Sequence, residues 1–509
     1  MNNINSKRIA KNTLYLYLRM LLVMFVSLFT VRIVLNALGA EDYGINNVVG
    51  GFVTLFAFLS STLNSASLRF FSYSIGQKNY RKLSEYFTMS FWCYVLLAFI
   101  IIVLAETIGL WFVYYKLTIP EGRLSAAIIV YQCSIFSFGY KLLTVPYNSL
   151  VIAHERMNLY AILGILECLS KLAVTYLLYI SPFDKLITYT VLWTLMTIAI
   201  DSYYIIYGLK HFKESRIKRF WNRSIFKEIA NYSGWSLFGA IADVIRGQGI
   251  NILLNIFFNP IVNAARAIAF QVNSQINQFV LNFYKAVQPQ ITKSYGAGDI
   301  VGLHSLVFRS SRFCYYLILI ISLPVLFESD YLLTIWLKNL PDNTVLFTRL
   351  VILNAVIDSI SYPLQTCISA TGKIRLYQFI TGGLLILNLP MAWLLLCNGY
   401  PPEITMYISI VVSIAAQGVR LLFVKEKVHL SVREYFYDVL LRICVVTFLS
   451  IVVPSFVFVY MNASLSRFIL VVFSCIISCI LSIWIVGITQ NERVYLSLIH
   501  ISEPTRRRG

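Results

Sequence analysis

Charged residues are scarce in this chain. They make up 13% of its 509 residues, whereas globular domains carry about 25%. Hydrophobic residues make up 58%, which is enough for about fourteen membrane crossings at roughly 20 residues each. A soluble enzyme is thereby excluded. A disordered chain is excluded as well, because 35 Phe and 33 Tyr favour burial.

Cysteine and the common catalytic motifs are also scarce. Nine cysteines are too few for a disulfide framework, and most lie in apolar runs where a thiol packs as a small hydrophobic group. The sequence contains no GxxxxGKS or GxxxxGKT loop, no HExxH motif and no GxSxG motif. We therefore expect no enzyme activity, no catalytic residue, no metal site and no cofactor.

Apolar runs bounded by charged residues, Gly and Pro predict an all-α membrane protein of about fourteen spans. The first run is too long for a signal peptide and contains Arg19, so we expect it to be retained. The predicted spans are residues 13–35, 48–75, 87–110, 124–151, 159–180, 186–209, 229–257, 261–289, 308–326, 346–370, 377–397, 404–423, 437–460 and 465–488.

The net charge of +19 is distributed unevenly among the loops. The loops on one side hold most of the basic residues, and this side is predicted to be cytoplasmic together with both termini. The charge therefore needs no nucleic-acid partner. The basic and aromatic segment 210–228 suits a linker on the anionic cytoplasmic leaflet. The opposite side holds only Lys116, Arg123, Lys185, Lys338 and Arg467.

An internal repeat relates the two halves of the chain. Leu35 and Asn36 match Leu254 and Asn255, and the pattern Ala-x-x-Arg-x-x-Leu-Tyr (153–160) matches Ala-x-x-Lys-x-x-Leu-Tyr (370–377). Each copy holds six spans, so the two copies have the same orientation in the membrane. The predicted domains are an N-terminal lobe (1–209), a linker (210–228), a C-terminal lobe (229–424) and two additional helices (425–495).

The eighth predicted span has the clearest polar face. Amides that end in a lysine suit sugar hydroxyls and a phosphate, so we predict that this face lines a water-filled cavity. The alternative is a set of amide hydrogen bonds that hold neighbouring helices together. At about 100° per residue, the residues on this arc are Gln271, Ser274, Gln275, Gln278, Asn282 and Lys285.

Ionisable residues within spans are functional candidates, because each costs about 2.5 to 3.5 kcal/mol to insert. Asp243 and Arg246 either neutralise one another or leave the arginine to bind an anion. Asp358 has no evident partner, and we predict that Asp243 or Asp358 binds a coupling ion. The other intramembrane charges, for most of which a structural role is the alternative, are Arg19, Arg32, Arg69, Glu167, Lys171 and Arg266.

Four segments resemble a known family, the O-antigen-type polysaccharide flippases of the multidrug/oligosaccharidyl-lipid/polysaccharide (MOP) exporter superfamily. The resemblance extends from the N-terminus to about residue 495. The segments are RMLLVMFVSLFTVRIVLNALGAEDYGINNVVGG (19–51), NILLNIFFNPIVNAARAIAFQVNSQINQFV (251–280), VQPQITKSYGAGD (287–299) and ATGKIRLYQ (370–378).

This resemblance implies two MATE-like lobes of six helices in a V around a cationic cavity, with two extra helices. Such a protein carries undecaprenyl-pyrophosphate-linked oligosaccharide from the cytoplasmic to the periplasmic leaflet of the bacterial inner membrane by alternating access. We expect a monomer in contact with membrane lipids, with H+ or Na+ as the coupling ion. The expected cavity residues are Arg32, Asn36, Arg246, Asn255, Arg266, Gln271, Gln275, Gln278, Asn282 and Lys285.

Two other functions stay open at this point. An ion-coupled multidrug exporter of the same superfamily is expected to have an acidic cavity for cationic drugs, whereas the polar face of the eighth span is rich in amides and basic. A membrane-embedded glycan polymerase or ligase is expected to have a large periplasmic loop, and all the predicted loops are short.

The end of the chain resembles something other than coding sequence. Residues 496–506, LSLIHISEPTR, look like the translation of a transposon-based sequencing adapter. We therefore expect the native sequence to end near Tyr495 and assign no function to residues 496–509.

Overall fold

The computed structural model describes residues 3–54, 57–115, 119–218, 221–258, 260–337, 341–489 and 492. Lys116, Lys338 and the tail that resembles an adapter lie outside these residues. Within the described part the regular structure is entirely helical. The chain divides into two compact units, an N-terminal unit (Lys11–Leu237) and a C-terminal unit (Phe238–Gly509 together with Met1–Ala10).

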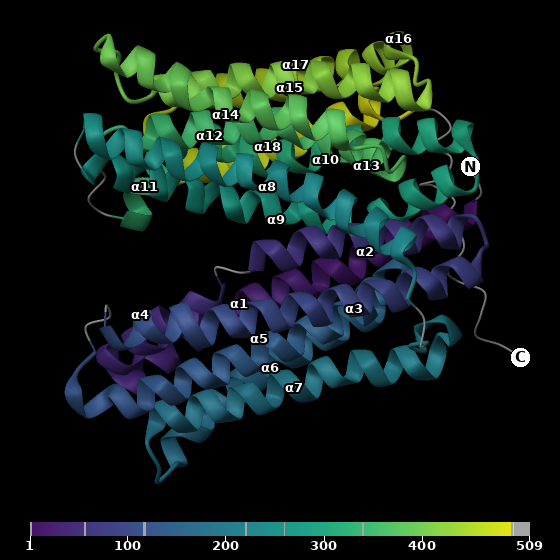
Figure 1. Cartoon of the computed structure of the whole chain (residues 1–509). Helices are drawn as coiled ribbons and strands as arrows, with labels where there is room; N and C mark the ends of the chain where they lie inside the picture. The colour runs from purple at the N-terminus through teal and green to yellow at the C-terminus, as the bar shows by residue number, and fades with distance from the viewer. Residues whose placement is uncertain are drawn as a thin grey trace, which may run out of the picture. The chain divides into compact units, whose positions relative to one another are not determined.

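The N-terminal unit is an antiparallel helix bundle (Figure 1). Its first helix is two helices joined at Gly39, whose φ of 80° is a backbone conformation that glycine adopts without strain. The helices are α1 (Asn3–Thr54), α2 (Ala57–Gly76), α3 (Tyr80–Leu104), α4 (Leu110–Tyr115), α5 (Leu124–Ala153), α6 (Met157–Ile180) and α7 (Lys185–His211), with the short turns η1 (Ala105–Gly109), η2 (Glu121–Arg123) and η3 (Lys213–Ser215).

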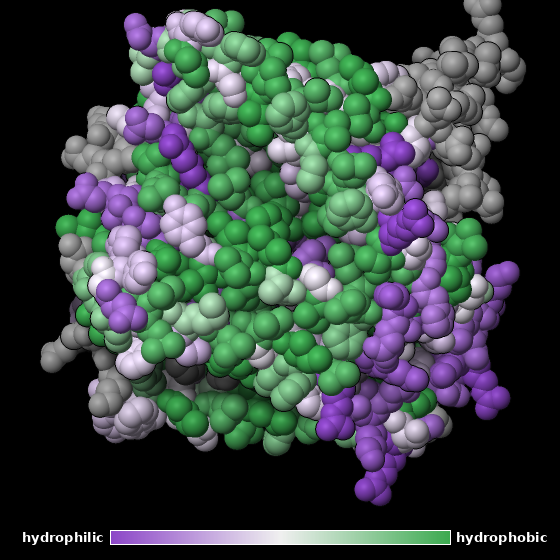
Figure 2. Space-filling view, turned by 90° about the horizontal axis from the view of Figure 1, so that it is seen from above, coloured by the Kyte–Doolittle hydropathy of each residue, from purple (hydrophilic) through white to green (hydrophobic). Residues whose placement is uncertain are grey.

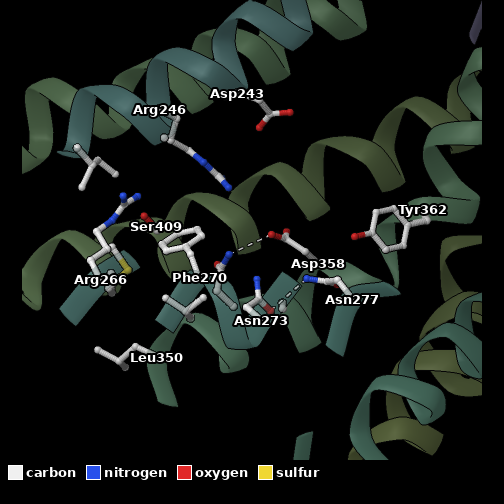
Figure 3. Close-up of a pocket in the computed structure, with 16 residues that line it drawn as sticks. Asp243, Arg246, Arg266, Phe270, Asn273, Asn277, Leu350, Asp358, Tyr362 and Ser409 are labelled. Carbon is white, nitrogen blue, oxygen red and sulfur yellow. Dashed lines mark hydrogen bonds between the residues drawn. The ribbon is translucent and has the colours of Figure 1, made fainter. Parts of the chain in front are cut away.

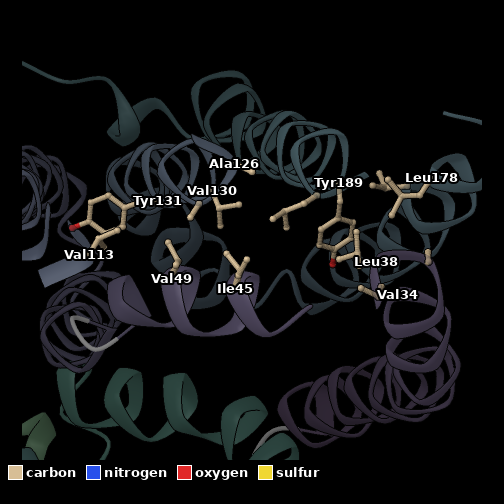
Figure 4. Close-up of a cluster of buried hydrophobic side chains, with 14 of the residues drawn as sticks. Val34, Leu38, Ile45, Val49, Val113, Ala126, Val130, Tyr131, Leu178 and Tyr189 are labelled. Carbon is tan, nitrogen blue, oxygen red and sulfur yellow. The ribbon is translucent and has the colours of Figure 1, made fainter. Parts of the chain in front are cut away.

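Side chains from six of these helical segments, α1, η1, α4, α5, α6 and α7, form a core cluster of the N-terminal unit (Figure 4). Val34 and Leu38 of α1 belong to one cluster with Val130 of α5, Leu178 of α6 and Tyr189 of α7. Between lipid-facing helices such packing stabilises through close contact, because the lipid tails are as apolar as the core.

The C-terminal unit begins within α8 (Arg223–Phe257). Its helix α9 starts at Pro260, a residue well suited to the first helical turn. The remaining helices are α9 (Pro260–Gly296), α10 (Ile300–Phe327), α11 (Ser329–Leu337), α12 (Thr344–Ser359), α13 (Ser361–Ala370), α14 (Arg375–Cys397), α15 (Ile404–Val428), α16 (Val432–Tyr435), α17 (Arg442–Tyr460) and α18 (Leu465–Ser482), with η4 (Phe436–Leu441) and η5 (Ile483–Gly487).

A bend of 41° separates α12 from α13. Pro363 lies in the first turn of α13 and cannot donate a hydrogen bond to the carbonyl of Ser359, which interrupts the helix. The Ser361 hydroxyl instead donates to the carbonyl of Asp358 at 2.6 Å. The bend therefore lies directly beside the Asp358 side chain.

The same pairs of helices pack in both units. In the N-terminal unit α5 contacts α2, α3 and α7, while α2 contacts α3 and α6 contacts α7. In the C-terminal unit α12 contacts α9, α10 and α15, while α9 contacts α10 and α14 contacts α15. Helices α17 and α18 pack on each other and on α10. This pattern matches the predicted pair of six-helix repeats with two additional helices.

Eleven described helices are long and apolar enough to cross a membrane, or twelve when α12 and α13 count as one bent span. The two other predicted spans fall on the end of α1 with α2, and on α9. Hydrophobic residues dominate the face seen in Figure 2. The prediction of an all-α, multi-pass membrane protein is confirmed.

Candidate functional site

A cavity of about 260 Å³ lies inside the C-terminal unit, between five helices (Figure 3). Each helix contributes at least one polar side chain to the wall. The polar lining residues are Asp243 and Arg246 of α8, Arg266, Asn273 and Asn277 of α9, Asn354 and Asp358 of α12, Tyr362 of α13 and Ser409 of α15. Apolar walls come from residues such as Phe270, Leu350 and Met406.

Two guanidinium groups belong to this cavity. Arg266 is 5% exposed and its guanidinium lies over the Phe270 ring, 4.3 Å from the ring centroid. One of its terminal nitrogens donates to the side-chain oxygen of Asn251. The aromatic ring thus holds the charge in place without neutralising it.

Arg246 has no hydrogen bond or ion pair within the described part of the chain. Figure 3 shows its side chain extending from α8 into the cavity. Asp243, three residues earlier, lies within electrostatic range but forms no ion pair with it among the described residues. Arg246 is therefore available to an anion in the cavity.

Asp358 is the most enclosed carboxylate of the cavity. Its Oδ2 accepts hydrogen bonds from the Asn354 side-chain amide at 3.1 Å and the Ser413 hydroxyl at 3.2 Å. Arg246 lies within electrostatic range of the same carboxylate. The hydroxyl and the amide stabilise the charge of Asp358 only in part.

The amide residues that face the cavity are not those of the predicted polar arc. Asn273 and Asn277 of α9 line the cavity and are joined by a hydrogen bond of 3.1 Å. With Arg266 and Phe270 they occupy a third face of α9, at positions i, i+4, i+7 and i+11. This helical spacing is visible in the sequence, but the predicted polar face does not include Asn273 or Asn277.

The predicted arc of α9 lies elsewhere. Gln271, Ser274, Gln275 and Gln278 are exposed, and Asn282 donates to the carbonyl of Gln278 at 2.8 Å. Lys285 is half-buried. None of these residues lines the described cavity, so a cavity beside this arc stays a prediction.

Other predicted residues are likewise outside this cavity. Asn255 of α8 and Asn36 of α1 are exposed, and the side chain of Arg32 lies outside the described part. In the N-terminal unit Arg19 lies over the Tyr160 ring and Lys171 over the Trp193 ring. Arg69 is surrounded by the rings of Phe70, Tyr73 and Tyr232. These three basic side chains lie against aromatic rings, an arrangement that is typical of charges with a structural role.

The chemistry of the cavity follows from its side chains. Two arginines provide forked donors for a phosphate or carboxylate. Asn273, Asn277 and Asn354 provide amide donors and acceptors for hydroxyl groups. Among the described residues there is no cluster of His, Cys, Asp and Glu that could hold a metal ion.

Comparison with known proteins shows the fold. No family model and no curated protein matches the sequence. A MATE transporter in a bent conformation superposes with a TM-score of 0.71 at 13% identity, over 84% of this chain and 96% of that chain. The chain therefore has the fold of MOP-superfamily transporters.

Two further structures agree. An outward-facing multidrug-resistance MATE transporter of the MOP superfamily has a TM-score of 0.69 at 12% identity, over 84% of this chain and 98% of its own. A MOP-superfamily transporter from Pyrococcus furiosus has a TM-score of 0.68 at 12% identity, over 82% of this chain and 96% of its own. The latter is described as having a binding pocket of reverse polarity that suggests a different function.

Proposed function

We propose that this protein is a flippase that moves a polyprenyl-pyrophosphate-linked oligosaccharide across the bacterial inner membrane by alternating access. The transported unit would be a repeat unit of O-antigen, capsule or exopolysaccharide. The lipid tail stays in the bilayer while the head group passes through the protein.

One observation carries this proposal. Arg246 and Arg266 both belong to a membrane-embedded cavity, and neither forms an ion pair with a carboxylate among the described residues. Two guanidinium groups within the membrane that make no ion-pair contact are expensive to keep, and an anionic ligand between them would offset this cost. The pyrophosphate of the lipid carrier has the charge and the geometry that two arginine forks accept.

The rest of the cavity suits the remainder of the head group. Amides of Asn273, Asn277 and Asn354 can exchange hydrogen bonds with the hydroxyls of the first sugars. Asp243 and Asp358 would bind the coupling ion, H+ or Na+. We further propose that the protein acts as a monomer, that both termini are cytoplasmic and that it has no nucleic-acid partner.

Reconstitution tests this function. Proteoliposomes containing the protein and a fluorescent undecaprenyl-pyrophosphate oligosaccharide should flip the lipid, whereas R246Q/R266Q should reduce the rate at least about tenfold, because each charged hydrogen bond contributes roughly 1.5 to 3 kcal/mol. Arg81 is the matched control, since its side chain is 90% exposed and contacts only Glu85 among the described residues. Equal flipping by R246Q/R266Q and R81Q would refute the assignment of the cavity.

A second function has its own support. Asp243 and Asp358 place two carboxylates in the cavity, and carboxylates also suit a cationic drug. The same vesicles would then take up a cationic dye in an ion gradient, and D243N/D358N would abolish uptake. Dye transport without lipid flipping would indicate that the protein is a multidrug exporter and not a flippase.

A further inference from the structure

A polar stripe runs along the buried face of α15, beside the cavity. Ser409, Ser413, Gln417 and Arg420 follow one another at intervals of four, four and three residues, which places them on one face of the helix. All four are buried. Ser409 lines the cavity, Ser413 binds Asp358, and Arg420 lies beyond them without being part of the cavity wall.

Arg420 is held among neutral partners. It is 7% exposed, and its Nε donates to the Tyr377 hydroxyl at 3.4 Å. The Gln365 amide, oriented to satisfy both groups, accepts from Nε and Nη2 at 3.3 Å. Nη1 has no hydrogen-bond partner among the described residues, and Arg420 forms no ion pair there. A buried guanidinium held in this way needs a negative charge nearby.

Two described carboxylates lie within electrostatic range of Arg420: Asp358 and the more exposed Asp243. Both Arg420 and Arg246 lie within electrostatic range of the Asp358 carboxylate, from α15 and α8 respectively, and neither forms an ion pair with it within the described part of the chain. Asp358 thus lies within range of two guanidinium groups that differ in how firmly they are held. Arg420 is fixed by Tyr377 and Gln365, whereas Arg246 has no partner that fixes it.

We propose that Arg420 is a positioning residue that compensates the charge of Asp358 and thereby keeps Arg246 free for the anionic ligand. Without Arg420, Asp358 would keep the hydrogen bonds from Asn354 and Ser413 and have Arg246 as the remaining guanidinium within range. Arg246 would then turn to Asp358 and form an ion pair, because leaving a buried charge unpaired is costly. An anion in the cavity would have to break that pair before it could bind.

The anion-binding part of this inference rests on the proposed function, but the state of Arg246 can be measured without any ligand. Phenylglyoxal reacts with guanidinium groups that are free of salt bridges, and peptide mass spectrometry locates the product. Arg81, 90% exposed in its side chain, provides the internal standard in each sample. Purified full-length protein would be labelled as wild type, R420Q, R420K, D358N and R420Q/D358N.

The variants have distinct expected results. R420Q should lower the labelling of Arg246 roughly tenfold, as expected for a new charged hydrogen bond. R420K retains the charge and should label as the wild type does. R420Q/D358N should restore the labelling, because the carboxylate that captures Arg246 is gone. Unchanged labelling in R420Q would overturn the proposal, as would a loss that D358N does not reverse.

Folding and ligand binding complete the test. If R420Q fails to fold, recovery of folded protein in R420Q/D358N supports the proposal, and a double variant that also fails to fold overturns it. Titration with inorganic pyrophosphate should show roughly tenfold weaker binding by R420Q and wild-type binding by the double variant. The two proposals can fail separately. If the wild-type protein binds no pyrophosphate but the variants show the expected labelling of Arg246, the proposed function loses support while the role of Arg420 stands.

Discussion

At the scale of single residues, Arg123 shows how a charge outside the membrane spans is used for structure. It donates to Asp42, which follows the break of α1 at Gly39, and to Asp184, the N-cap of α7, with 2.8 Å from its Nε to Asp42 Oδ1. Burial would raise the pKa of Asp184, but hydrogen bonds from the Ile187 backbone and from Arg123 outweigh it and lower that pKa. The same two carboxylates raise the pKa of Arg123. Three segments of the N-terminal unit are thereby joined.

This contact predicts a dependence of stability on pH. Because the pKa of Asp184 is lower in the folded than in the unfolded protein, its contribution is present above the unfolded value of about 3.9 and is lost as pH falls through the folded value. D184N keeps the helix cap but loses the charge. Thermal unfolding in detergent should show D184N destabilised by about 1 kcal/mol at pH 7, a small effect because both partners are partly exposed. The difference should shrink as the pH falls below about 3.9 and vanish below the folded pKa of Asp184, whereas a difference that stayed constant over this range would argue against an effect of the charge.

At the same scale, Arg246, Arg266 and Arg420 differ from Arg123 in having no carboxylate in contact among the described residues. The sequence shows all four as arginines within or near predicted spans. Their partners come from helices far apart in the chain, so composition and spacing cannot separate a structural arginine from one that serves a ligand.

At the scale of elements, α9 combines three faces. One is apolar, one is the exposed arc from Gln271 to Lys285, and one carries Arg266, Asn273 and Asn277 toward the cavity. Its polarity explains why a helix of 37 residues is absent from the helices that pass as membrane spans by composition. Such a helix is stable in a membrane only where other helices or water cover its polar faces.

The bend between α12 and α13 is a second feature at this scale. P363A supplies the missing N–H for the Ser359 carbonyl and should straighten the helix. Asp358 and Tyr362, on either side of the bend, would then separate, so lipid flipping should slow several-fold without loss of thermal stability. P324A, which removes a proline inside α10 away from the cavity, is the control. Equal rates for wild type and P363A would show that the bend has no part in transport.

At the scale of the whole molecule, the two units repeat one packing scheme. Corresponding helix pairs make contact in each, although few residues are identical between the repeats. The cavity with its charges lies within the C-terminal unit, whereas Arg19, Arg69 and Lys171 of the N-terminal unit rest against aromatic rings. The repeats thus share architecture, but the described charges have different surroundings in each.

The orientation of the chain also belongs to this scale. Lys213 and Lys185 lie at opposite ends of α7 and its following turn, and the distribution of basic residues predicts that Lys213 is cytoplasmic. K185C should react with a membrane-impermeant maleimide in spheroplasts, while K213C should react only after permeabilisation. Labelling of the wild-type protein serves as the control for reaction of the native cysteines, of which Cys397 and Cys444 are exposed. Labelling of K213C in intact spheroplasts would reverse the orientation.

Much of the fold could be predicted from the sequence. Apolar runs long enough to span a bilayer must form helices there, because the backbone has no other way to satisfy its hydrogen bonds. The repeat, the additional C-terminal helices and the presence of charge on α8, α9 and α12 follow from the same reading. Arg246, Arg266, Asp243 and Asp358 were identified as candidates in this way and lie around one cavity.

Tertiary packing decided which of the polar residues meet. Helical spacing indicates that residues share a face, but the rotation of the helix about its axis depends on its neighbours. For this reason α9 turns Asn273 and Asn277 toward the cavity and the longer glutamine arc away from it. The packing of α15 against α12 likewise brings Arg420 within electrostatic range of Asp358. The sequence supplies the charges, and helix packing determines which of them remain free to bind.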